Sequence, residues 1–599
     1  MTAELFNTDV NMDGLLEVLG KNLYSSPNVA IRELVQNAHD ACVRREIEEE
    51  GEHSFRIQLI PDYAKKTLTI IDSGSGLTFE EIRTYLATIG SGYTRVLRDS
   101  TQTEDMIGYF GLGFLSAYVV SDRVSVVTTS YQTPDKTWRF VSKGGKTFSI
   151  EQLDESHPVG TTVTLNLSES FHSLSEHDLL DGLLRKYCSL IQIPIYLADS
   201  TEAVNEIQVP WRNEYQSDIK RTKDNLAFAQ IFEDIFQPIC TIEIPKDNPH
   251  GVNGLIWIQD SSGYSTSDYR NVSVFVRNMF ITHEGRELLP LWAGFVGCVL
   301  ESNQLIPTAS REDLQKTDYY YQVQDFLTET LINGLKNIAA TQSENWRRIL
   351  ARHNQALIGA SVTDDDLFLL LKDSLKITTS HGDISVDKLL SLSKNKFYVQ
   401  LEDKNNYEQI LFRANNIPVV YGYLFAVSSF CNKYADFYQK ELVNLGTEKG
   451  KKQLFSLQAV EPEQAAKFES LFKKSGDSLF YTHIEPAEIP LVIVEDKDAA
   501  LKKRIDEDEN NKKIGSAALA LAQIYTKDID ATNERDVFIN LNSPLIKKVI
   551  ESDDVQAKVL ADMLRSFTAI LCHDAVEEGC DFQGELAQFN QSLLTILDK

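Results

Sequence analysis

Apolar and polar positions follow two different periods along the first third of the chain. One set of apolar residues recurs at helical spacing and predicts a helix with a buried face: Ile31, Leu34, Val35, Ala38 and Cys42. Glu33, Asn37 and Asp40 lie on the opposite face of this helix. Period-two stretches at 67–71 and 163–167 predict strands, and a second helix is expected over 179–190. This alternation predicts one α/β layer domain that ends near residue 198.

The pattern changes in the later parts of the chain. Strands are expected at 254–258 and 272–276, before a helix from about Tyr319 to Ala351. A smaller α/β unit follows, with strands at 396–400 and 417–421 and a helix near 407–415. The charged segment 495–513 is expected to be a loop inside the last domain. At 599 residues, the chain is long enough for about three or four domains.

Two helices with wide apolar stripes are predicted near the end of the chain. The first stripe consists of Val559, Leu560, Met563, Leu564, Phe567, Ile570 and Leu571. The second consists of Leu586, Phe589, Leu593, Leu594 and Leu597. Any helix packed in a core has such a stripe, but two of them at a chain end also fit a dimer bundle. Both interpretations stay open.

Composition excludes several classes of protein. The 59 basic and 87 acidic residues give a net charge of −28, which argues against a general surface for nucleic acid or anionic membrane. The seven cysteines are scattered without a C-x-x-C pair, as expected for reduced thiols in a cytosolic protein. The first nine residues have no apolar signal region, and no uncharged apolar run is long enough to cross a bilayer.

Other short segments of the chain change the interpretation of the polar face of the first helix. Alone, such a face is usually solvated, although a carboxylate and an amide one turn apart suit a catalytic base and a Mg²⁺ ligand. Asp72 follows a strand and precedes Gly74 and Gly76, so its carboxylate can accept a hydrogen bond from an exocyclic amine. The loop Gly108-x-x-Gly111-x-Gly113 opens onto an apolar helix at 114–120 and can cradle phosphate. With Gly160-Thr161, these segments predict an ATP site.

Two common nucleotide motifs fail when they are checked. Gly74-Ser-Gly76 has Phe79 where a dinucleotide fingerprint needs its third glycine. Gly145-Lys146-Thr147 imitates the end of a P-loop, but Phe140 stands where the upstream glycine is required. Neither a Rossmann nor a Walker site is therefore expected.

The segments 23–41 and 108–118 resemble the signature helix and glycine loop of the 90-kilodalton heat-shock chaperones (heat shock protein 90). That family belongs to the GHKL superfamily, which includes gyrase, sensor histidine kinases and mismatch-repair ATPases. The resemblance implies that Glu33 orients the attacking water, Asn37 holds Mg²⁺ and Asp72 bonds the adenine amino group. The other residues that it implies line the pocket are Asp40, Gly76, Gly108, Phe110, Gly111, Gly113 and Thr161.

The resemblance continues beyond the ATP site. Segments 275–281, 295–302 and 310–315 are similar to successive blocks of the family's middle domain, where the arginine and glutamine of the last block, here Arg311 and Gln315, reach the γ-phosphate. The last domain resembles the family less closely, mainly at 537–542. Ser91 replaces a lysine usual in the lid, and the long charged linker and acidic tail of eukaryotic cytosolic members are absent. The missing linker and tail favour a bacterial-type cytoplasmic member, whereas Ser91 weakens the expectation that the lid contacts phosphate.

The resemblance implies an α/β (α+β) fold in three domains. These are a GHKL-type (Bergerat) α/β sandwich ATPase domain at 1–205, an α/β middle domain with large and small subdomains at 206–427, and a mainly helical dimerisation domain at 428–599. It implies a homodimeric chaperone that hydrolyses ATP with Mg²⁺ and acts on unfolded or partly folded clients, without nucleic-acid or membrane partners. A sensor kinase is disfavoured, because it needs a phosphoacceptor histidine on a dimerising helix before the ATP domain, and residues 1–23 contain no histidine. A dedicated ATP-gated clamp on one partner stays open.

Overall fold

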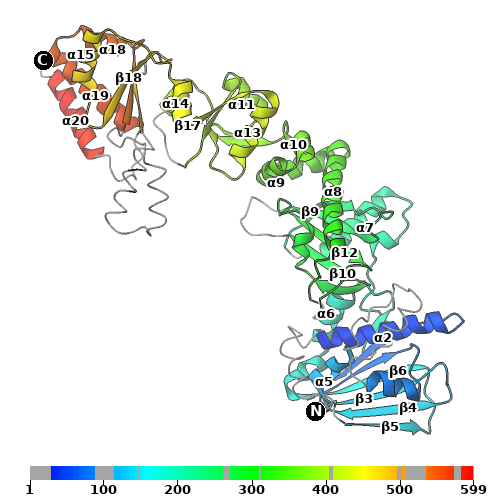
Figure 1. Cartoon of the computed structure of the whole chain (residues 1–599). Helices are drawn as coiled ribbons and strands as arrows, with labels where there is room; N and C mark the ends of the chain where they lie inside the picture. Colours follow the sequence, from blue (N-terminus) through cyan, green and yellow to red (C-terminus); the bar gives the residue numbers. More distant parts are fainter. Residues whose placement is uncertain are drawn as a thin grey trace, which may run out of the picture. The chain divides into compact units, whose positions relative to one another are not determined.

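The computed structural model describes residues 29–87, 113–145, 147–233, 235–260, 270–308, 312–403, 409–495, 535–572 and 582–597, with 502 and 505. The chain divides into two compact units, Met1–His353 and Asn354–Lys599 (Figure 1). Mixed sheets and helices occur in both, so the predicted α/β class is confirmed.

The first sheet of the N-terminal unit has seven strands. They are β1 (Ile57–Asp62), β2 (Thr67–Asp72), β3 (Ser121–Thr129), β4 (Thr137–Lys143), β5 (Thr147–Leu153), β6 (Gly160–Leu167) and β7 (Ile195–Leu197). Their spatial order is β5-β4-β3-β6-β2-β1-β7, and every pair is antiparallel except β1 with β7.

Helices cover one face of this sheet. The segments are α2 (Val29–Glu48), α3 (Phe79–Glu81), η2 (Ile82–Leu86), η3 (Gly113–Leu115), α5 (Ser116–Val120), η4 (Glu169–Ser175) and α6 (His177–Cys188). Apolar side chains of α2 and α6 share one core with the strands, because Leu34 and Leu184 pack with Ile70 and Leu165. The result is a two-layer sandwich, with the residues predicted to bind nucleotide on α2, β2 and β6.

A second sheet of the same unit has five strands, β8 (Pro238–Glu243), β9 (Val252–Gln259), β10 (Asn271–Val276), β11 (Met279–Thr282) and β12 (Val296–Ser302). Their order is β11-β10-β12-β9-β8, so β8 is an edge strand. The associated helices are η5 (Pro210–Arg212), α7 (Asp218–Ile231), η6 (Gly285–Leu288) and α8 (Asp318–Thr341). Both α7 and α8 contact β8.

Trp257 on β9 organises the core of this second sheet. Its buried indole Nε1 donates a hydrogen bond to Glu233 Oε2 at 2.9 Å, and Gln259 Nε2 donates to the same oxygen at 2.8 Å. Gly297 lies opposite Trp257 on β12, where a Cβ atom would stand 2.1 Å from the indole ring. A side chain at position 297 would therefore overlap the tryptophan.

The C-terminal unit contains two smaller sheets. One has the order β14-β13-β16-β15-β17, with β13 (Lys376–Thr379), β14 (Gly382–Ser385), β15 (Lys396–Gln400), β16 (Val420–Tyr421) and β17 (Glu441–Leu445). The other has the order β18-β20-β19, with β18 (Asp477–Thr482), β19 (Leu491–Glu495) and β20 (Arg535–Asn540). Its core joins β19 and β20 to three helices of the C-terminal part.

The remaining helices are α9 (Ser343–Thr363), α10 (Asp365–Leu371), α11 (Val386–Leu392), α12 (Gln409–Ala414), α13 (Val427–Tyr438), α14 (Glu448–Leu454), α15 (Pro462–Phe472), α18 (Pro544–Glu551), α19 (Asp554–Cys572) and α20 (Phe582–Leu597). The single helix predicted over 319–351 is wrong. Gln342 leaves helical geometry at φ −128° and ψ 63°, so α8 ends there and α9 begins afresh. Apolar spacing alone does not register such a break.

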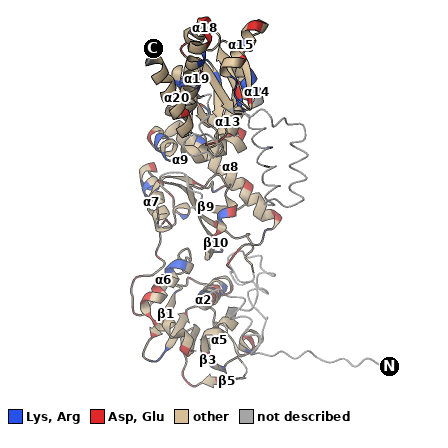
Figure 2. Cartoon of the chain, turned by 90° about the vertical axis from the view of Figure 1, so that its left-hand side faces the viewer, with Lys and Arg blue, Asp and Glu red and all other residues tan. Residues whose placement is uncertain are grey.

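The surface carries both signs of charge. Figure 2 shows that acidic and basic residues are interspersed along the backbone of both units. Among the helices that the structure describes, none combines the length and the apolar character needed to cross a membrane.

Candidate functional site

The helix α2 presents its three candidate polar residues in different environments. Glu33 and Asp40 are buried, with exposed fractions of 3% and 5%, whereas Asn37 is exposed. A solvated polar face, the simpler interpretation of this pattern, is therefore excluded for the two carboxylates. Buried carboxylates need hydrogen-bonding or charged partners, so the neighbours of Glu33 decide its chemistry.

Arg32 is a charged partner of Glu33. Its Nε and Nη2 atoms donate to Glu33 Oε1 at 3.3 and 3.2 Å, and both side chains are almost completely buried. The guanidinium of Arg32 also lies 5.8 Å from the ring centroid of Tyr187 on α6. Arg32 is not among the residues predicted from the sequence, because side chains of adjacent residues on a helix normally do not face each other.

Asp72 lies where it was predicted, at the last position of β2. It pairs with Thr161 on β6, and its Oδ1 accepts a hydrogen bond from the Gly74 N–H at 2.9 Å. Burial raises the pKa of this carboxyl to about 7, although backbone hydrogen bonds from Gly74 and Thr161 act in the opposite direction. Asp72 is therefore a buried acid whose charge is sensitive to any further hydrogen-bond donor.

The turn after Asp72 is seated between α2 and β3. A Cβ atom on Gly74 would lie 2.5 Å from the Ala41 carbonyl carbon, and the Ser75 N–H donates to the Ala41 carbonyl at 2.9 Å. Gly76 has φ +61°, and a Cβ atom there would lie 1.9 Å from the Thr129 carbonyl oxygen. Both glycines are needed for this packing, and their approach to a flat base stays a prediction.

Thr161 joins this turn through Thr128 on β3. The two hydroxyl oxygens are 3.1 Å apart, and Thr128 Oγ1 also accepts from the Leu77 N–H at 2.9 Å. The structure thus brings Asp72, Gly76 and Thr161 together at one end of the β3-β6-β2 strands, against α2.

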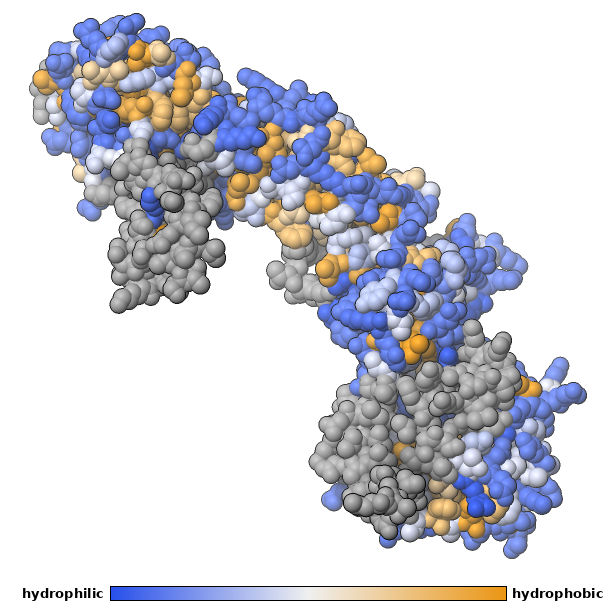
Figure 3. Space-filling model, viewed as in Figure 1, coloured by the Kyte–Doolittle hydropathy of each residue, from blue (hydrophilic) through white to orange (hydrophobic). Residues whose placement is uncertain are grey.

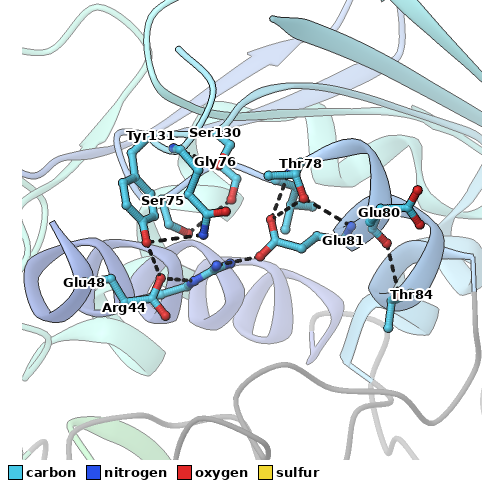
Figure 4. Close-up of polar contacts among 12 residues, drawn as sticks. Arg44, Glu48, Ser75, Gly76, Thr78, Glu80, Glu81, Thr84, Ser130 and Tyr131 are labelled. Carbon is cyan, nitrogen blue, oxygen red and sulfur yellow. Dashed lines mark hydrogen bonds and ion pairs between the residues drawn. The ribbon is translucent and has the colours of Figure 1, made fainter.

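A polar network ties the C-terminal half of α2 to the segment after this turn (Figure 4). Arg44 donates to Glu48 at 2.8 Å and to Glu81 at 2.5 Å, and the Tyr131 hydroxyl donates to Glu48 at 2.8 Å. Glu81 also completes a capping box with Thr78 at the start of α3. The network fixes α3 on α2, and no residue spacing in the sequence indicated it.

Several predicted site residues lie outside the part of the chain that the structure describes. They are Gly108, Phe110 and Gly111 of the glycine loop, Ser91 of the lid, and Arg311. Gly113 begins η3, which contacts α2 and leads into α5, so the helix predicted at 114–120 is present. Gln315 is exposed, and its Nε2 donates to the Pro307 carbonyl at 2.9 Å within its own loop.

Comparison with known proteins defines first the class of the domain that contains α2 and the seven-stranded sheet, and then the family of the chain. Residues 24–176 match the family model described as "Histidine kinase-, DNA gyrase B-, and HSP90-like ATPase", so this domain is a member of that ATPase class. Residues 258–599, more than half of the chain, match the model "Hsp90 protein". The chain belongs to the Hsp90 family, which confirms the resemblance seen in the sequence.

Curated relatives agree with this assignment. "Chaperone protein HtpG" of Desulfitobacterium hafniense is 27% identical over 357 residues, which are 57% of each chain. Proteins of the same name from Paramagnetospirillum magneticum and Methylorubrum extorquens (strain PA1) are 28% and 29% identical. These alignments cover 62% of both chains in the first case, and 70% of this chain and 72% of the relative in the second. The chain thus spans about three-fifths of the length of the Desulfitobacterium and Paramagnetospirillum relatives.

Proposed function

We propose that this protein is an ATP-dependent molecular chaperone that binds and hydrolyses ATP to open and close a dimeric clamp on client proteins. One observation carries the proposal: within a domain of this ATPase class, buried Asp72 ends β2 and leads into a glycine turn that packs against α2, the helix that also holds buried Glu33. One carboxylate is suited to recognise a base and the other to assist hydrolysis.

In this proposal each residue has a distinct role. Glu33 orients the attacking water, and Asp72 accepts a hydrogen bond from the adenine amino group. Asp40, Gly76 and Thr161 line the pocket together with the glycine-loop residues Gly108, Phe110, Gly111 and Gly113. Arg311 and Gln315 reach the γ-phosphate, where a guanidinium stabilises spread phosphoryl charge.

Mg²⁺ fits the proposed site through Asn37. Within the described residues, no cluster of three or more His, Cys, Asp or Glu side chains could hold a metal ion by itself. Mg²⁺ keeps several waters and takes other oxygen ligands from the substrate's phosphates, so it needs few protein ligands, and the exposed Asn37 amide on α2 would supply one oxygen. When bound, the ion would neutralise charge on the phosphates.

A chaperone of this kind should suppress the aggregation of several unrelated, chemically denatured proteins, measured by light scattering with and without ATP. We expect suppression of all of them and a different degree of suppression in the two nucleotide states, because ATP can do work only if client affinity differs between states. No suppression of any substrate, together with co-purification of one protein at fixed ratio, would instead establish the dedicated clamp. The names of the relatives do not favour that alternative.

Dimerisation is proposed through α19 and α20. Phe567 and Phe589 stack between these helices with ring centroids 5.9 Å apart, yet much of both stripes remains exposed. Leu571 and Leu594 have exposed fractions of 53% and 55% (Figure 3 shows apolar side chains among the hydrophilic surface of this unit). Large apolar side chains exposed on two helices that contact each other are typical of a protein interface.

Sedimentation of the Leu571→Glu, Leu594→Glu double variant tests this interface. We expect wild-type protein to sediment as a dimer and the variant as a monomer, because two charges would be buried in an apolar interface. Leu457→Glu is the matched control, since Leu457 is also exposed but lies outside both helices. A double variant that remains fully dimeric with an unchanged circular dichroism spectrum would place the interface elsewhere.

We also propose the remaining organisation. The domains are an ATPase domain at 1–205, a middle domain at 206–427 and a dimerisation domain at 428–599. The protein acts in the cytoplasm on unfolded or partly folded clients. Its net charge of −28 supports the absence of nucleic-acid and anionic-membrane partners.

A further inference from the structure

A groove runs along the free edge of the second sheet in the N-terminal unit. Its volume is about 470 Å³, within the usual range of ligand sites. The edge strand β8 lines it with residues 239–243, α7 forms one wall and α8 the other. Among the residues that the structure describes, none of those proposed to bind nucleotide lines this groove.

Side chains that alternate along β8 contact α7 on one face of the strand and α8 on the other. On one face, the Glu243 carboxylate accepts a hydrogen bond from Asn225 Nδ2 at 2.7 Å and forms an ion pair with Arg221 Nε at 3.3 Å, both on α7. On the other face, Ile242 meets α8 at Gly334, where a Cβ atom would lie 2.5 Å from the isoleucine. The strand edge between these faces forms the floor of the groove.

The floor presents backbone groups to the groove. The Ile244 N–H donates to the Gly254 carbonyl on β9, so the antiparallel register makes Ile242 and Cys240 the next residues bonded to β9. The N–H and C=O groups of Thr241 and Glu243 consequently point away from β9. Among the described strands, none lies beyond β8, so these groups are available to another extended chain.

Polar side chains surround this edge. Asn225 is 3% exposed, lines the groove, and its Oδ1 has no hydrogen-bond partner among the described residues. Asn333 and Asn337, one turn apart on α8, line the opposite wall with Gln342. Amide side chains donate and accept at once, as the alternating donors and acceptors of a peptide backbone require. An unsatisfied buried acceptor is costly until a donor reaches it.

We propose that this groove binds an extended segment of unfolded polypeptide, which adds to β8 as a further antiparallel or parallel strand. Main-chain hydrogen bonds to Thr241 and Glu243 would supply affinity without sequence specificity, and the amides of α7 and α8 would hold the outer side of the bound backbone. This inference deepens the proposed chaperone function and rests on it, because it assigns the client contact to one strand edge.

Peptide binding to the full-length protein tests the inference. The probe is a fluorescein-labelled, lysine-flanked peptide of about ten alternating threonine and valine residues, the upper length of a strand. We expect Thr241→Pro to weaken its binding about tenfold in fluorescence anisotropy, because proline removes an outward N–H that β9 does not use. Thr241→Val, which keeps that N–H and the branched side chain, should stay within about twofold of wild type.

A second pair of variants, one that fills the groove from the α8 wall and one control, tests the same site. Asn333→Trp should weaken binding to a similar extent by filling the space, whereas Gln322→Trp, an exposed position on α8 outside the groove, should not. The same peptide N-methylated at alternate residues should also bind weakly, since it lacks the donors of one edge. Bound peptide should slow hydrogen exchange at the amides of Thr241 and Glu243.

The outcomes separate the two proposals. Aggregation suppression by wild-type protein with unchanged peptide binding in both Thr241→Pro and Asn333→Trp, or with no added protection at these amides, would overturn the groove alone. Absence of both peptide binding and aggregation suppression in wild-type protein would overturn the chaperone function and this inference together.

Discussion

Replacing Glu33 by glutamine is expected to slow ATP hydrolysis by roughly 10²-fold or more while nucleotide still binds, because the amide cannot accept a proton from the attacking water. Glutamine is preferred to alanine because Glu33 pairs with buried Arg32. Removing one member of a buried ion pair entirely costs about 3–5 kcal/mol of stability, which would confuse loss of catalysis with loss of fold. Steady-state phosphate release and equilibrium ATP binding are the two measurements.

The matched control is Glu46→Gln, an exposed glutamate of the same helix. It should leave both turnover and affinity unchanged. Normal turnover in Glu33→Gln, or a loss of affinity as large as the loss of turnover, would contradict the role of a general base. The thermal midpoint of each variant shows whether the fold is intact.

Asp72→Asn is expected to weaken nucleotide binding itself by roughly ten- to hundredfold. The carboxylate accepts from the Gly74 N–H and, in the proposed complex, from the adenine amino group. An asparagine can orient only one oxygen, and its NH₂ group would face one of these donors. Isothermal titration with ADP measures the loss, and Asp122→Asn, an exposed aspartate on β3, is the control. Unchanged affinity in Asp72→Asn would remove this residue from base recognition.

The same carboxyl should make binding depend on pH. Its pKa is raised to about 7 in the free protein, and a donor from the base favours the charged form, so binding lowers that pKa. Affinity should therefore rise about tenfold per pH unit below 7 and level off above it. Adenosine is the suitable probe, because it has no titrating phosphate. Asp72→Asn should abolish this dependence, and a flat wild-type profile between pH 5 and 8 would contradict it.

Linkage gives the corresponding effect on stability. A carboxyl whose pKa is raised on folding binds its proton more tightly in the folded state than in the unfolded state. Asp72 thus stabilises the nucleotide-free fold most at pH values below about 4, and this contribution is lost as the pH rises through about 7.

Sequence periodicity predicted the elements around the proposed nucleotide site well. Apolar spacing indicated α2, strict alternation indicated β2 with Asp72 at its end, and β6 followed the same rule. These signals are strong because each element packs one face on a single core. The break between α8 and α9 at Gln342 was not predicted, because it is a local backbone change inside an otherwise continuous apolar pattern.

The ion pairs around the proposed nucleotide site could not be predicted from the sequence. Arg32 follows no spacing rule that would pair it with its neighbour Glu33, and Arg44 reaches Glu81 thirty-seven positions away. The sequence also did not indicate that β8 is an edge strand, because this depends on the order of strands in the sheet, which the alternation of side chains does not encode.

The contact between Trp257 and Gly297 also limits the paths by which this sheet can change over evolutionary time. A larger residue at position 297 would overlap the indole while the tryptophan is present, whereas a smaller residue at 257 first leaves a cavity that a later substitution at 297 can fill. The order of the two substitutions therefore matters, and the sites are coupled rather than additive. Among relatives, a bulky residue at one position should accompany a small one at the other, and a lineage that leaves the present arrangement should lose the tryptophan first.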